Sequence, residues 1–328
     1  MNQEEKRSAW LQERRAFACG TDVSRIMRAS RYGGPVDVYL EKKGLAPKKK
    51  SSLVQTRGQI LEPALLGWYS KQTGHDVLHP DDPIIAGSTA WHGASLDGYA
   101  RTGDIEYMVV DAKTSRDRDE WGASGSCRVP IEVEIQMRWY MPILEHHLNQ
   151  SGVDGSCVRA VLPTYFPLQD EFCLFYVDRD LEVEERMVNL VDEWWKRHIV
   201  KGHRPEIDAS KAASLLLEGT YDSNQALPRR ESSEAEEGIA WTLQNVKQQI
   251  KDLQEQQRLL ENRLKECIGP AKGIYGKGFK LSWGWQKAPA RLNTKRLRAD
   301  HPDIVSEYTE SADKPVRVFR TTFKTKTN

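Results

Sequence analysis

The chain has 328 residues and a net charge of +1, with 39% apolar and 29% charged residues, which is typical of a globular protein with one large domain or two smaller ones. No run approaches the roughly 18 apolar residues that cross a bilayer, and the polar residues 1–7 predict no secretory signal. The five cysteines are scattered without a C-x-x-C pair, so reduced thiols in the cytoplasm are favoured over disulfides or a zinc site.

The first part of the chain is predicted to be helical. Short helices are expected from near Thr21 and over Val36–Lys43, separated by the chain-breaking residues 33–35. Between Thr56 and Gln72, apolar residues recur at helical spacing, which predicts an amphipathic helix that carries Glu62.

Residues 84–114 are predicted to form a strand meander, because short β-type runs alternate with Gly and charged turns. A helix, two buried strands and a second long helix are expected next, over 131–148, 158–162, 172–177 and 181–200. This order predicts an α/β or α+β domain with a mixed central sheet flanked by helices.

The sequence changes character after Pro205. We therefore expect a first domain over residues 1–205 and a C-terminal extension over residues 206–328. The extension is predicted to hold a long helix over 241–268 with about three heptads, and a β-hairpin over 273–285. Such a helix is expected to pack on the core or a neighbouring subunit, or to bind a partner as a zipper.

Charge is unevenly distributed along the chain. Residues 1–60 carry 13 Lys/Arg against 6 Asp/Glu, residues 61–130 carry 6 against 11, and residues 271–328 carry 13 against 5. An acidic stretch between basic ends suits a protein that holds a polyanion with its flanks and a metal ion at its middle. Chance segregation of surface charge is the alternative.

Two short motifs carry the candidate chemistry: S-L-D-G at 95–98 and V-V-D-A-K at 109–113. Alternate residues of a strand share a face, so Asp111 and Lys113 are expected on one side. A turn between paired strands would return Asp97 beside Asp111. Asp-x-Lys alone is a weak signal, but it follows the apolar Met108-Val109-Val110, so its charges are expected to lie next to a buried strand.

Two carboxylates and one ammonium in a single cleft suit phosphodiester hydrolysis. Carboxylate oxygens are the ligands that Mg²⁺ prefers, and the bound metal activates water and polarises the phosphate. Lys113 would stabilise negative charge and orient the nucleophile, and the neighbouring carboxylates are expected to keep it protonated. Without a G-x4-G-K-[S/T] motif, no use of ATP is expected.

The order of these motifs resembles the lambda-exonuclease/YqaJ family of phage-type recombination nucleases, in the PD-(D/E)xK superfamily. The resemblance covers about residues 8–205. The residues that carry it are, in chain order, Trp10, Arg14, Thr21, Glu62 in G-Q-I-L-E-P, Asp97, Asp111-Ala112-Lys113, and Gln136 and Tyr140 in E-I-Q-M-R-W-Y.

The resemblance implies a role for each of these positions. Asp97, Asp111, the Ala112 carbonyl and Glu62 would hold metal, Lys113 and Gln136 would act beside the scissile phosphate, and Tyr140 would lie one turn from Gln136. Arg14, Thr21 and Gln136 would bind a 5′-terminal phosphate. Two positions depart from the family pattern: Asp111 stands where Glu is common, and Thr21 replaces a serine.

The resemblance further implies a PD-(D/E)xK core and a 5′→3′ exonuclease that degrades one strand of linear duplex DNA. The expected cofactor is Mg²⁺, two ions per site, with Mn²⁺ as a substitute. The 3′ overhangs would serve recombination by single-strand annealing. Further expectations are a ring-shaped homotrimer, an annealing-protein partner, and a phage or prophage origin in the bacterial cytoplasm without a membrane partner.

Two rival functions remain open. The first is an endonuclease of the same superfamily, acting in DNA repair or restriction. The second is a non-catalytic DNA-binding scaffold that keeps the fold, although Glu62, Asp97, Asp111 and Lys113 are all intact.

Overall fold

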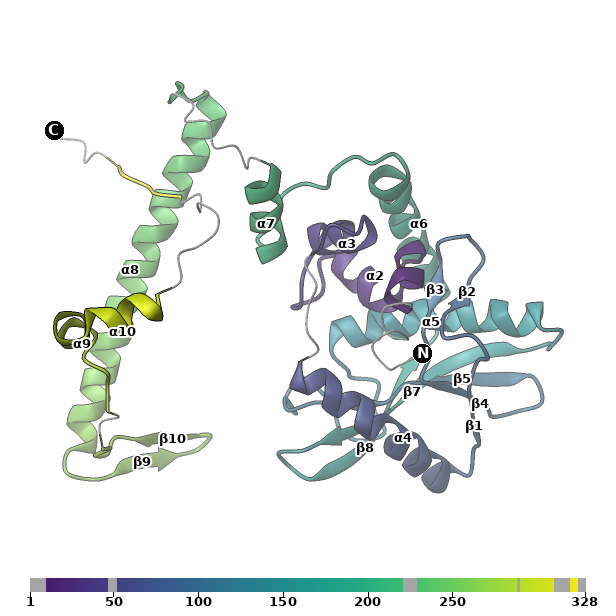
Figure 1. Cartoon of the computed structure of the whole chain (residues 1–328). Coiled ribbons are helices and arrows are strands. Elements are labelled where there is room, and N and C mark those ends of the chain that lie inside the picture. Colours follow the sequence, from purple (N-terminus) through teal and green to yellow (C-terminus); the bar gives the residue numbers. More distant parts are fainter. Residues whose placement is uncertain (1–9, 47–51, 221–228, 288–289, 310–318, 324–328) are drawn as a thin grey trace. The chain divides into compact units, whose positions relative to one another are not determined.

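The computed structural model describes residues 10–46, 52–220, 229–287, 290–309 and 319–323. The chain forms two compact units, Met1–Asp222 and Ser223–Asn328 (Figure 1). Within the described ranges, no helix is both long enough and apolar enough to cross a membrane.

A mixed sheet forms the centre of the first unit. Its strands are β1 (Val77–Leu78), β4 (Gly98–Arg101), β5 (Glu106–Val110), β6 (Lys113–Thr114), β7 (Ser156–Phe166) and β8 (Glu171–Asp178). β4 pairs antiparallel with β1 and β5, while β5 and β6 both run parallel to β7, and β8 is antiparallel to β7. Two further short strands, β2 (Ile85–Ala86) and β3 (Gly93–Ala94), form a separate pair.

Helices cover both faces of this sheet (Figure 1). α4 (Leu53–Thr73) packs on one face, where Leu66 and Tyr69 meet Met108 and Val110. α5 (Ile131–Gln150) covers the other face, where Val109 joins the main core. Because β5 alternates its side chains between two buried faces, almost the whole strand is apolar.

Shorter helices surround α5. α2 (Gly20–Ile26) and α6 (Leu181–Trp195) contribute to the main core. α3 (Pro35–Lys42) follows α2 and packs with α7 (Lys211–Thr220) in a small separate cluster. The remaining helical turns are η1 (Arg14–Ala16) and the π-helical turn η2 (Lys196–Val200), which directly follows α6.

The second unit is built on one long helix. α8 (Glu234–Ile268) precedes the hairpin of β9 (Gly273–Gly276) and β10 (Phe279–Ser282), and α9 (Thr294–Asp300) and α10 (Pro302–Glu307) follow. Ser233 caps α8 together with Glu236, a Ser-x-x-Glu capping box.

The predicted mixed sheet flanked by helices is confirmed, as are the hairpin and the long helix of the extension. The long helix begins at Glu234 rather than at Trp241, because the capping box fixes its start. We expected a domain boundary at residue 205, but the structure divides the chain after Asp222. The cause is α7, whose Ala213 is buried against Val36 and Leu40 of α3.

All five cysteines are free thiols. Three of them are buried in the first unit: Cys19, Cys157 and Cys173. Cys127 of the first unit and Cys267 of the second are exposed.

Candidate active site

Two acidic side chains meet where β4 begins and β5 ends. The antiparallel register pairs Gly98 with Val110, so Asp97 and Asp111 occupy the next opposed positions. The Ala112 N–H donates a hydrogen bond of 2.8 Å to Asp97 Oδ2. The expected return of Asp97 to the side of Asp111 is therefore found.

The backbone is interrupted at this point. β5 and β6 both pair with β7, but Asp111 and Ala112 lie between them, and the Ala112 N–H bonds to Asp97 instead of continuing the ladder. On the other side of β4, Gly98 allows β1 to lie close, because a Cβ there would lie 2.4 Å from Val77 Cγ1. The interruption places Asp111 and Ala112 at the junction of β4, β5 and β6.

A chain of polar contacts runs from Asp111 to helix α5. The Lys113 ammonium forms an ion pair with the Asp111 carboxylate, and Lys113 Nζ donates to Gln136 Oε1 at 3.1 Å. Gln136 Nε2 then donates to the Tyr140 hydroxyl at 3.2 Å, one helical turn further on. Lys113 thus points to the same side of the sheet as Asp111, as the strand period predicts.

Glu62 approaches this group from α4. It lines a hollow of about 640 Å³ together with Ser70, Asp76 and His79. Burial raises the pKa of Glu62, and the neighbouring Asp111 raises it further.

The three acids crowd negative charge around one ammonium. Burial raises the pKa of Asp97 well above its ordinary value, and the carboxylates of Asp111 and Glu62 add to this. Burial alone would lower the pKa of Lys113, but the carboxylates of Asp111 and Asp97 outweigh it, so the pKa is raised. The raised pKa favours the protonated form of Lys113, around which three acidic side chains are gathered.

The donor atoms fit a hard divalent cation. Among the residues that the structure describes, no group of three or more His, Cys, Asp and Glu side chains is arranged to hold a metal by itself. Asp111 is only 2% exposed, and its Oδ2 touches Lys113 Nζ but accepts no hydrogen bond of normal geometry. Two carboxylates, with water and substrate oxygens completing the shell, match the usual protein ligation of Mg²⁺.

A second charged cluster lies at the start of α2. Asp22 is 1% exposed, and three cations surround it: Lys42 at 2.7 Å, Arg25, and Arg14 at 3.6 Å. Arg14 also donates to the Thr21 hydroxyl, while its buried Nε has no hydrogen-bond partner.

Gly20 allows the two clusters to lie close together. A Cβ at Gly20 would lie 2.6 Å from Gln136 Cγ and 2.9 Å from Tyr140 Cε1. Only a residue without a side chain lets the start of α2 approach α5 this closely. Arg14 and Thr21 are thereby held near Gln136 and Tyr140. Burial raises the pKa of Tyr140, and Asp111 raises it further, whereas Arg14 lowers it.

The structure gathers the predicted residues in one region of the first unit. Hydrogen bonds and one ion pair connect a set of six residues: Asp97, Asp111, Ala112, Lys113, Gln136 and Tyr140. Glu62 lies near this set on α4. Arg14 and Thr21 form a neighbouring hydrogen-bonded pair. The sequence did not single out Asp22 or Lys42. The only local signal was Asp22 at the third position of α2, where its carboxylate accepts from the Cys19 N–H.

Comparison with known proteins bears on the same part of the chain. Residues 9–147 match the YqaJ-like viral recombinase domain. Protein YqaJ of Bacillus subtilis (strain 168) is 25% identical over 316 residues, which cover 92% of this chain and 91% of the relative.

Solved structures similar to the chain include several exonucleases. An alkaline exonuclease from Laribacter hongkongensis has 15% identity and a TM-score of 0.43, covering 65% of this chain and 97% of that one. A putative exonuclease from Eubacterium rectale has 9% identity and a TM-score of 0.44, with coverages of 71% and 96%. A phage-related exonuclease from Haemophilus somnus has 11% identity and a TM-score of 0.39, with coverages of 57% and 96%.

Proposed function

We propose that the protein is a Mg²⁺-dependent 5′→3′ exonuclease acting on linear duplex DNA, on the premise that residues 9–147 match the YqaJ-like viral recombinase domain. The observation that carries the proposal is the meeting of Asp97, Asp111 and Lys113 where β4 and β5 meet.

The carboxylates of Asp97 and Asp111 with the Ala112 carbonyl would hold the metal ion, and Glu62 would serve a second ion. When bound, Mg²⁺ supplies a water of lowered pKa and polarises the phosphate. Mn²⁺ has the same preference for oxygen ligands and is proposed as a substitute.

The remaining roles belong to side chains. Lys113, held protonated by the carboxylates around it, stabilises charge that develops on the scissile phosphate and positions the attacking water. Gln136 fixes the Lys113 ammonium through its Oε1 and is itself placed by Tyr140.

The direction of cutting is proposed from the cluster around Arg14. A guanidinium matches a phosphate dianion in shape and charge, and the buried Arg14 Nε is left without a partner. With Thr21 beside it, Arg14 would hold the 5′-terminal phosphate next to the cleft, so nucleotides leave from that end.

The biological setting is also a proposal. Degrading one strand would leave a 3′ single strand for an annealing protein, as in phage-type recombination in the bacterial cytoplasm. A homotrimeric ring around DNA would make the reaction processive, and sizing of the pure protein tests that state.

The experiment compares linear duplex DNA with 5′-phosphate or 5′-hydroxyl ends, in Mg²⁺ or in EDTA. We expect degradation only with Mg²⁺ and faster on phosphorylated ends. Lys113→Ala and Asp111→Asn should lower turnover by at least about 10²–10³-fold while DNA binding persists, and Arg14→Ala should erode the end preference. Chelator-resistant degradation, or near-normal turnover in either cleft variant, contradicts the proposal.

Closed circular DNA separates the rival functions. An exonuclease cannot begin on a circle, whereas an endonuclease of the same superfamily would open it. A scaffold would bind linear duplex and leave it intact under every metal condition.

A further inference from the structure

A dense run of cations follows α6. We call residues Lys196–Arg204 the basic segment: it comprises η2 and the four residues after it. Its basic members are Lys196, Arg197, His198, Lys201, His203 and Arg204, and it contains no acidic residue. All of them except the half-buried His198 are exposed.

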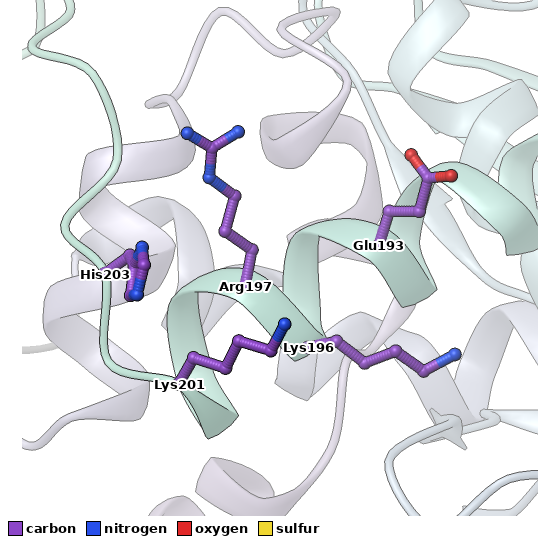
Figure 2. A pocket seen from close by; sticks show the side chains of 5 residues that line it. All are labelled: Glu193, Lys196, Arg197, Lys201 and His203. Atoms are coloured by element: carbon purple, nitrogen blue, oxygen red, sulfur yellow. The ribbon is translucent and has the colours of Figure 1, made fainter.

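Part of the basic segment surrounds a hollow of about 420 Å³ (Figure 2). The hollow is lined by Lys196, Arg197, Lys201 and His203, with Glu193 as the one acidic residue. In the view of Figure 2, Glu193 lies at the opposite end of the hollow from His203. The charge that faces solvent here is therefore mainly positive.

Two of these cations have no ion-pair partner among the residues that the structure describes. Lys196 lies 3.6 Å from Asp192 and over the Trp91 ring. By contrast, no carboxylate among the described residues is within ion-pair distance of Arg197 or Lys201. Like charges four residues apart on a helical turn repel one another, so an anion bound between them would stabilise the segment.

The helix dipole does not account for the whole run. Cations in the last turn of a helix are favoured by its negative end, but this effect fades beyond that turn. Here the cations continue past the end of η2 to His203 and Arg204. The widened π-helical turn itself is uncommon in proteins and often occurs at functional sites.

One helix links the basic segment to the Arg14 cluster. On α3, Lys42 Nζ bonds to Asp22 and to the Arg14 carbonyl, at 2.7 and 2.9 Å. The next residue, Lys43, donates through Nζ to the Ile199 carbonyl of η2 at 2.7 Å. The two groups of cations are therefore neighbours in the first unit.

We propose that the basic segment binds the phosphate backbone of duplex DNA outside the cleft, with Arg197 and Lys201 as the principal contacts. This rests on the proposed nuclease function and adds the surface on which the uncut part of the duplex lies. Contacts between exposed cations and phosphate carry no information about the bases, so binding here is independent of base sequence.

The test measures DNA affinity by fluorescence anisotropy in EDTA, with a labelled duplex, over a series of NaCl concentrations. The variants are Arg197→Gln, Lys201→Gln and the double change. Each lost phosphate contact should reduce the slope of log affinity against log salt by about 0.9 and weaken binding roughly fivefold at physiological salt. In cleavage with Mg²⁺, KM should rise while kcat stays near that of the wild type.

Arg186→Gln is the matched control, because it removes the same charge from α6, the helix that leads into the basic segment, at a residue already paired with Glu182. It should leave the salt slope unchanged. If the wild type binds and degrades DNA but the double variant keeps its salt slope, the segment serves another partner and this inference fails alone. If the wild type neither binds nor degrades DNA, the proposed function fails with it.

Discussion

Asp22 and Asp37 occupy the same position in consecutive helices. Each lies three residues after the N-cap and accepts a hydrogen bond from the N-cap N–H, of Cys19 and Gly34 respectively. They differ in charge environment: Asp22 is surrounded by three cations, whereas no described cation lies within ion-pair distance of Asp37.

Removing the charge of Asp22 should therefore be costly. Asp22→Asn leaves three buried or half-buried cations without their shared carboxylate and is expected to lower the free energy of unfolding by about 3–5 kcal/mol. Asp37→Asn weakens only a helix cap and should cost about 1 kcal/mol. Urea unfolding of both variants measures the difference, and equal losses would mean that the ion cluster does not stabilise the fold.

Asp22 also predicts a dependence on pH. Burial alone would raise its pKa, but Lys42, Arg14 and Arg25 outweigh this and hold the pKa far below its ordinary value of 3.8. A depressed carboxyl pKa stabilises the fold above the ordinary value, and that stability is lost as the pH falls toward the folded-state pKa. Between pH 5 and pH 3, wild-type stability should fall more steeply than that of Asp22→Asn; parallel curves would contradict the assignment.

The candidate site was predictable at this scale where its residues form local motifs. Asp97, Asp111 and Lys113 could be found because alternate residues of a strand share a face, and because a turn between paired strands brings Asp97 back beside Asp111. Asp22 could not, because its partners Arg14 and Lys42 lie on other elements and only packing brings them together.

Among the elements, the contact of α2 with α5 depends on Gly20. A methyl group there would displace Gln136 and with it the support of Lys113. Gly20→Ala should lower stability by about 1–3 kcal/mol and lower kcat, as measured by unfolding and by cleavage of linear duplex.

Gly67→Ala on α4 is the control for this change. A Cβ at Gly67 would meet nothing within 4 Å, so alanine should raise stability by about 0.5–1 kcal/mol through its higher helix propensity. If both variants shift stability in the same direction, close packing at Gly20 is not the cause.

Most helices and strands followed from periodicity, since long amphipathic or apolar runs determine α4, α5, α6, β7 and β8. The two-residue strand β1 could not be predicted in this way, because it is too short to show a period and is defined only by its pairing with β4. The sequence predicted one helix up to Val200, but α6 ends at Trp195 and a π-helical turn follows it. No local sequence pattern indicated this turn.

For the whole molecule, the position of the domain boundary has a measurable consequence. All candidate site residues lie in the first unit, so a chain of residues 1–222 should keep Mg²⁺-dependent degradation of linear duplex. A chain of residues 1–205 lacks Ala213, which packs on α3, and Asp208, whose carboxylate accepts a hydrogen bond from the Val36 N–H. We expect it to lose about 2–4 kcal/mol of stability and much of its activity.

Urea unfolding and nuclease assays on both truncated chains measure this outcome. Equal stability of the two chains would place the boundary at 205, as the sequence suggested. Loss of activity in residues 1–222 would assign the second unit a part in the reaction.

The free thiols give the molecule a natural pair of attachment points. Cys127 and Cys267 are exposed and lie in different units, while the other three cysteines are shielded by packing. A maleimide donor and acceptor dye would therefore label one position on each unit of the native protein without engineering. Energy transfer between them would then follow the spacing of the units as duplex DNA is added.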